Sequence, residues 1–226
     1  MTGLGALSRF ARPGRAARTN EEVCALCSAP VSPVHPHVVD LTARAVECAC
    51  RACGLLFAQP GAGARFRTVP TRVLEDRGGA IAEADWAALE IPVRLAFLFH
   101  SSAAGRWLAV YPSPVGPTES ALPLEAWARV SAGWRLAALA EPDVEALLVR
   151  GEAHAGQGRG GGGQGPLRCM LVPIDRCYEL VGRIRRTWRG FDGGDEVRRE
   201  IDAFFADLSR RARPPEGDAC SSAPGA

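Results

Sequence analysis

The sequence of 226 residues contains no lysine, so all 27 of its basic side chains are arginines. A phosphate-binding Walker loop requires a lysine and is therefore excluded. The Gly-x-Ser-x-Gly elbow of hydrolases and the His-Glu-x-x-His motif of zinc proteases are also missing. We find no catalytic motif and expect a protein that is not an enzyme.

Long hydrophobic runs are also missing. The longest apolar run, residues 95–99, is far too short to cross a bilayer. No positively charged start precedes a hydrophobic region, so we expect no secretory signal. The net charge of +2 is too small to predict attraction to nucleic acid or to a membrane surface. We expect a cytoplasmic protein that is not inserted into a membrane.

Cysteine, by contrast, is abundant and clustered near the N-terminus. Two C-x-x-C pairs, Cys24/Cys27 and Cys50/Cys53, supply the four thiolates that a tetrahedral ion such as zinc requires. We therefore predict a zinc-ribbon-like module over residues 21–60, with these four cysteines as metal ligands in a reducing compartment. A segment this short has little apolar surface, so metal binding would largely be its folding reaction.

The local pattern around the cysteines predicts a hairpin. Residues 37–41 and 45–48 have the composition of short strands joined by the turn at residues 42–44. Gly54 suits a tight turn after Cys53. Three apolar residues follow and are expected to cover the site: Leu55, Leu56 and Phe57.

Several alternatives remain open around the cluster. Iron also accepts tetrahedral thiolates, so a rubredoxin-like site competes with zinc, although the first knuckle continues without a glycine at Ser28. A redox dithiol would carry one C-x-x-C at a helix start, not two. Cys48 is read as a partly buried free thiol that could also replace a ligand or contact one. His35 and His37 are left outside the ligand shell because four cysteines already saturate a tetrahedral ion.

The remainder of the chain predicts an α+β domain over residues 61–212, with a basic disordered arm (1–20) before the module and a disordered tail (213–226) after the domain. Two strand pairs and three helical segments lead us to expect an antiparallel sheet of two hairpins with helices packed on one face. The strands are expected at 93–99, 106–111, 144–149 and 167–172, with the helices at 123–141, 174–188 and 195–208. A flexible glycine-rich loop, 151–166, separates the second strand pair. It contains the dinucleotide-type pattern Gly-x-Gly-x-x-Gly, but a strand and not a helix follows, so we assign it no nucleotide.

Few other residues suggest chemistry. Asp175, Tyr178 and Glu179 at the start of a helix could line a cleft, although helix solvation explains them equally well. Neither His100 nor His154 has an orienting acid nearby in sequence. The two remaining cysteines of the domain, Cys169 and Cys177, are expected to be too buried to react.

A set of short motifs along the chain resembles an uncharacterised bacterial family defined by a domain of unknown function. The resemblance covers roughly residues 20 to 212 and rests on residues 24–27, 50–57, 91–93, 111–114, 142–149, 172–182 and 188–194. Members of that family are encoded beside genes for nickel-iron hydrogenases. The resemblance therefore implies a non-catalytic accessory role through contacts with hydrogenase subunits or maturation factors, and it supplies no catalytic residue.

Two other functions are weighed against this role. A rubredoxin-like iron protein would pass electrons to or from the same enzyme. A zinc ribbon that binds nucleic acid would need a basic face interleaved with aromatic residues, which is not found around the cysteines.

Overall fold

The structure is a computed structural model that describes residues 22–58, 65–76, 78–79, 81–151, 167–189 and 194–215. The basic arm predicted at 1–20, the glycine-rich loop after Gly151 with its dinucleotide-type pattern, and the tail from residue 216 lie outside these residues. The described chain extends past the predicted domain end at residue 212, since Arg213 exchanges backbone hydrogen bonds with Val73 and Glu75.

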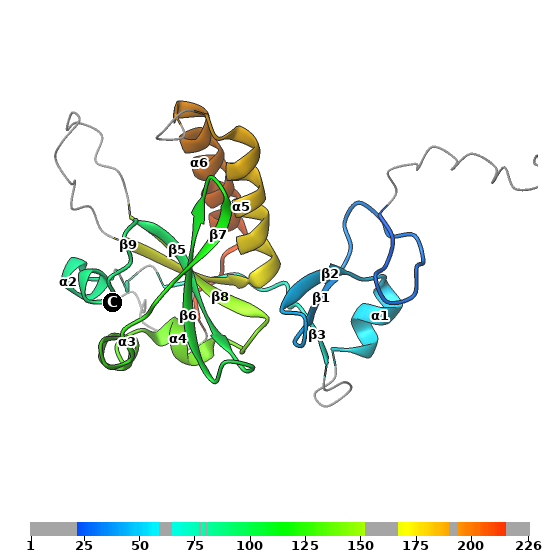
Figure 1. The fold of residues 1–226 in the computed structure, drawn as a ribbon, viewed down its shortest axis with the longest axis horizontal. Coiled ribbons are helices and arrows are strands. Elements are labelled where there is room, and N and C mark those ends of the chain that lie inside the picture. The colour runs from blue at the N-terminus through cyan, green and yellow to red at the C-terminus, as the bar shows by residue number, and fades with distance from the viewer. Residues whose placement is uncertain are drawn as a thin grey trace, which may run out of the picture.

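The N-terminal part is a small antiparallel sheet with one short helix (Figure 1). Strands β1 (His37–Asp40) and β2 (Ala45–Cys48) form the predicted hairpin, and helix α1 (Arg51–Leu56) follows. Asp40 Oδ1 accepts hydrogen bonds from the backbone N–H groups of Thr42 and Ala43, which stabilises the turn. Strand β3 (Phe66–Thr68) pairs with the other edge of β1, giving the order β2-β1-β3.

The larger part is a six-stranded antiparallel sheet in the order β4-β9-β8-β5-β6-β7. Its strands are β4 (Leu74–Glu75), β5 (Leu95–Ser101), β6 (Arg106–Ser113), β7 (Gly116–Ser120), β8 (Glu145–Gly151) and β9 (Leu167–Pro173). The predicted hairpins are β5/β6 and β8/β9, and β5 joins them by pairing with β8. The observed sheet is wider than the two hairpins expected, because β4 and β7 are added at its edges.

Strand β7 arises where the sequence predicted an end. Pro112 lies beyond the last pair that β6 makes with β5, and it faces Pro117 of β7. Proline is tolerated there because no strand pairs with the outer side of β7. The proline-rich segment therefore turns the chain and adds an edge strand.

Helices cover both faces of the large sheet, and not only the one face predicted. Helices α5 (Ile174–Thr187) and α6 (Gly194–Arg211) pack on the face that carries Phe97 and Phe99. Helices α2 (Glu83–Ala88), α3 (Leu124–Ser131) and α4 (Arg135–Leu139) cover the face of Ala96 and Leu98 (Figure 1). Within the described ranges, no helix is long and apolar enough to span a bilayer.

The small sheet is packed against the large one. Val39 and Val69 belong to the same hydrophobic core as α5 and α6, with Val46 packed against it. Val38, the neighbour of Val39, instead lies in a separate small core with Cys24 and Ala49. The two faces of β1 thus serve two different cores, since neighbouring side chains on a strand alternate in direction.

Polar contacts reinforce this junction. Arg67 Nη1 donates a hydrogen bond to the carbonyl oxygen of Pro142 at 2.6 Å. Arg72 pairs with Glu145, whose carboxylate is fully buried, through Nε···Oε1 and Nη2···Oε2 distances of 2.6 and 2.7 Å. The cysteine-bearing sheet is therefore fixed to the larger one by apolar packing and by ion pairs.

Candidate metal centre

The first cysteine pair lies on a tight backbone turn. The N–H of Cys24 donates to the carbonyl oxygen of Ala29, and the N–H of Ser28 donates to that of Cys24, both at 2.8 Å. Ser28 has φ +60°, a left-handed conformation that glycine adopts more readily. The turn that brings Cys27 back toward Cys24 thus forms despite the missing glycine.

The second pair is positioned by the start of α1. Cys50 is the N-cap residue, and its Sγ accepts a hydrogen bond from the N–H of Cys53 with an N···S distance of 3.5 Å. The N–H of Ala25 donates to the carbonyl oxygen of Cys48 at 2.9 Å, which connects the two turns. The hairpin β1/β2 therefore returns the chain so that both pairs meet.

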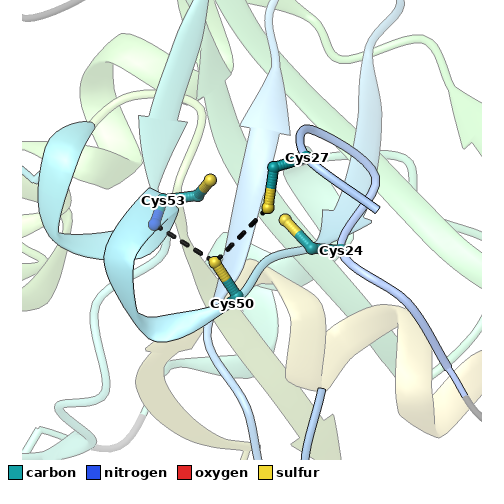
Figure 2. A group of neighbouring side chains, drawn as sticks. All are labelled: Cys24, Cys27, Cys50 and Cys53. Atoms are coloured by element: carbon teal, nitrogen blue, oxygen red, sulfur yellow. Dashed lines mark hydrogen bonds between the residues drawn. The ribbon is translucent and has the colours of Figure 1, made fainter. Parts of the chain in front are cut away.

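The four predicted ligand residues converge on a common centre, as Figure 2 shows. The Sγ atoms of Cys24, Cys27, Cys50 and Cys53 all lie within 4.8 Å of one another. Cys27 Sγ and Cys50 Sγ are 3.7 Å apart. A tetrahedral zinc with bonds of about 2.3 Å to sulfur requires sulfur–sulfur separations of about 3.8 Å, so the cluster has the size of a zinc site.

No disulfide involves these residues, because all four cysteines are free thiols. The structure therefore disfavours the disulfide alternative and leaves a four-cysteine cluster that could hold a metal ion. Iron forms similar bonds to thiolates, so the cluster by itself does not identify the metal. The ligand role of each cysteine stays a prediction.

The covering of the cluster differs from what the sequence suggested. Leu55 and Leu56 were expected to shield the sulfurs, but they are 63% and 59% exposed. They lie two and three positions beyond Cys53, on other faces of the helix, whereas Phe57 is four positions on and shares the face of Cys53. Phe57 packs against Phe66 in the small core.

Gly54 also has a different role from the one predicted. It lies within α1 and not in a tight turn. A Cβ atom built on Gly54 would come within 2.9 Å of Pro36 Cβ. The glycine is therefore required because the helix packs closely against the segment before β1.

The thiols of the cluster differ in acidity. Burial raises the pKa of Cys24, but hydrogen bonds from backbone N–H groups around it outweigh this effect and lower the pKa to about 6. Burial, together with neighbouring thiols, raises the pKa of Cys53 to about 12. A metal ion would have to displace protons from the less acidic thiols, so its affinity should fall as the pH is lowered.

The other candidate residues do not join this cluster. Cys169 and Cys177 are buried as predicted, and burial raises the pKa of both thiols, that of Cys169 to about 12. His100 lies in β5 with its ring edge toward Trp107, away from either cysteine pair. His154 falls outside the described residues.

The start of α5 does not form one pocket from its three candidate residues. Asp175 and Glu179 line a cavity of about 490 Å³, whereas Tyr178 lines another of about 340 Å³. Glu179 is engaged by Arg183, with an Nη2···Oε1 distance of 2.7 Å. Asp175 pairs instead with His37 of the small sheet.

A second cluster contains residues that the sequence left outside the ligand shell. Potential ligand atoms of His35, His37 and Cys48 lie within 4.8 Å of one another. The predicted hairpin already implied part of this arrangement, since a turn at 42–44 places His37 opposite Cys48. Cys48 was thought to share a strand face with Cys50, but β2 ends at Cys48 and the chain turns before Cys50.

The fold and the site define a mixed α+β protein with a four-cysteine cluster suited to a metal ion. The chain belongs to the family described as "Family of unknown function (DUF5947)", whose model matches residues 23–212. The match spans both sheets and both pairs of cysteines. Searches of curated proteins and of solved structures each returned no significant match.

Proposed function

We propose that this protein is a non-catalytic accessory protein whose N-terminal module is held together by structural zinc and acts through protein–protein contacts. The observation that supports this proposal most is the convergence of the four Sγ atoms within 4.8 Å. Four thiolates close the coordination shell of zinc and leave no position for a substrate, which is typical of structural sites.

The small size of the module's own core supports a structural role for the metal. The buried apolar residues gathered around the cluster are few: Cys24, Val38 and Ala49. Burial of so little surface contributes little folding free energy, whereas structural zinc contributes folding free energy directly. Metal binding would thus order the knuckles and α1.

The surface of the module offers a place for a partner. Leu55 and Leu56 on α1 are exposed, as are Val23 and Val34 beside the first pair and the histidines. Exposed large apolar side chains that gather on a small module favour a protein interface. Hydrogenase subunits or maturation factors are proposed as the partner on the basis of the family resemblance described above.

Co-purification tests the partner. A tagged full chain from cells expressing a nickel-iron hydrogenase should retain hydrogenase subunits or a maturation factor. The variant carrying Leu55→Ser and Leu56→Ser should lose them while keeping its metal. Leu124→Ser is the matched control, because Leu124 is equally exposed at 59% but lies on α3 of the larger part. Retention by all variants, or normal hydrogenase activity in a deletion strain, would contradict the proposal.

A rubredoxin-like iron protein is the second candidate. The exposure of Cys27 favours it, because a ligand at the surface shortens the path for an electron to a partner. Anaerobically prepared protein would then contain one iron with a reversible one-electron couple. Zinc in the four-cysteine site excludes this candidate.

A further inference from the structure

The residues of the second cluster are brought together by the ladder of the small sheet. His37 of β1 is the register partner of Cys48 of β2, so their side chains project from the same face. His35 lies two positions before His37, and the two rings are 4.8 Å apart between centroids. A ring nitrogen of each histidine and Cys48 Sγ lie within 4.8 Å of one another.

This cluster lies on the opposite face of the small sheet from the four cysteines. His37 and Cys48 share a face with Val39 and Val46, which pack toward the larger part. Val38 points to the other face and into the core of Cys24. The two clusters share no ligand, and the fifth cysteine of the N-terminal group therefore has a separate set of neighbours.

Both histidines are oriented through Nδ1. His37 Nδ1 lies 2.9 Å from Asp175 Oδ2, and His35 Nδ1 lies 2.8 Å from the carbonyl oxygen of Ser32. Histidine ligands of metals commonly donate one ring N–H to a carboxylate or a backbone carbonyl, which fixes the tautomer and leaves the other nitrogen to bind the ion. Nε2 of each ring is thus the nitrogen left for a metal.

The burial of His35 indicates a ligand. Its side chain is only 7% exposed. Its Nε2 is buried and has no hydrogen-bond partner in the part of the protein that the structure describes. A buried polar atom without a partner costs about 1–3 kcal/mol. A role limited to linking the small sheet to α5 would require His37 and Asp175, but neither the buried Nε2 of His35 nor the thiol of Cys48.

We propose that His35, His37 and Cys48 form a second zinc site, with Asp175 and the Ser32 carbonyl as its outer hydrogen-bond partners. Two imidazole nitrogens and one thiolate suit zinc and leave one of four coordination positions for a water or for another ligand. A cavity of about 490 Å³ is lined by both histidines, together with Asp175 and the basic side chains Arg176 and Arg211. The fourth ligand enters from this cavity.

Zinc stoichiometry of the full chain tests the proposal. Wild-type protein saturated with zinc and desalted should retain two ions, and Cys48→Ser and His35→Gln should each retain one. His100→Gln is the matched control and should retain two, because His100 belongs to neither cluster. A wild-type stoichiometry of one, or two ions in both cluster variants, would overturn the second site.

A change beyond the ligands keeps the test informative if a cluster variant fails to fold. Asp175→Asn keeps all three ligands but removes the carboxylate that orients His37. Changes of this kind weaken metal binding by about 10–100-fold, so one zinc should bind more weakly by this factor while the other is unaffected. Equal affinities of Asp175→Asn and wild type for both ions would contradict the proposal.

Discussion

The two sheets of this protein are stabilised in different ways. The six-stranded sheet is covered on both faces by helices, and its cores include large side chains that are almost fully buried, such as Phe97, Leu147 and Phe204. The three-stranded sheet has a core of a few small residues beside four cysteine sulfurs. Apolar burial is sufficient to explain the first, whereas the second needs a cross-link, which a metal ion would provide.

The difference predicts that metal loss affects one region far more than the other. Cys50→Ser, or removal of the ion by a chelator, should unfold the knuckles and α1, because structural zinc binds zinc-finger peptides with about 10–16 kcal/mol. Hydrogen exchange should become fast at Ala25 and Gly54, while amides in β8 and β9 stay protected. Unchanged exchange at Ala25 and Gly54 would show that the small sheet does not depend on the ion.

The converse change is in the apolar core of the larger part. Phe204→Ala removes a side chain with 0% exposure and should lower the free energy of unfolding by about 3–5 kcal/mol. Chemical denaturation measures the loss, and elemental analysis should find the metal content unaltered. Phe205→Leu, at a neighbouring buried position, retains most of the apolar volume and serves as a milder control. Loss of metal from folded Phe204→Ala would contradict the separation of the two regions.

The junction between the regions should be less costly to disturb. Arg72→Ala leaves the carboxylate of Glu145 buried without its guanidinium partner. Because Arg72 itself is partly exposed, we expect a loss of about 2–3 kcal/mol, at or below the lower end for broken buried pairs. The double variant Arg72→Met and Glu145→Leu should recover much of the loss. A loss below about 0.5 kcal/mol for Arg72→Ala would show that the pair contributes little.

The smallest effect is a pH dependence at the hairpin turn. The hydrogen bond and charge of Arg65, with two backbone N–H groups, lower the pKa of Asp40 from 3.8 to about 2. A carboxyl whose pKa is lowered by folding stabilises the folded state above its unfolded pKa, and this contribution is lost as the pH falls toward the folded value. The stability difference between wild type and Arg65→Ala should therefore shrink from pH 4 to about pH 2. A difference independent of pH would contradict this assignment.

Much of this architecture is encoded locally and could be predicted. The hairpins β1/β2, β5/β6 and β8/β9 follow from short apolar runs between turn residues. Helix α5 follows from apolar residues at three- and four-residue spacing, and Cys177 is on its buried face as expected. The four-cysteine cluster follows from its two C-x-x-C pairs.

Other features depend on packing between distant segments and were missed. The helices on the second face of the large sheet could have been inferred, since β5 carries apolar residues on both faces (Ala96 and Leu98 against Phe97 and Phe99), which indicates burial on both. The contact between His37 and Asp175 could not, because nothing local in the sequence sets how the small sheet sits against α5.

X-ray absorption at the zinc edge of natively purified Cys48→Ser protein tests the central claim most directly, because this variant keeps the four-cysteine cluster and removes the thiol of the second one. We predict one zinc per chain surrounded by four sulfur atoms at about 2.3 Å. Iron in place of zinc, a shell with fewer than four sulfurs, or protein that is folded over residues 22–58 without any metal would contradict it.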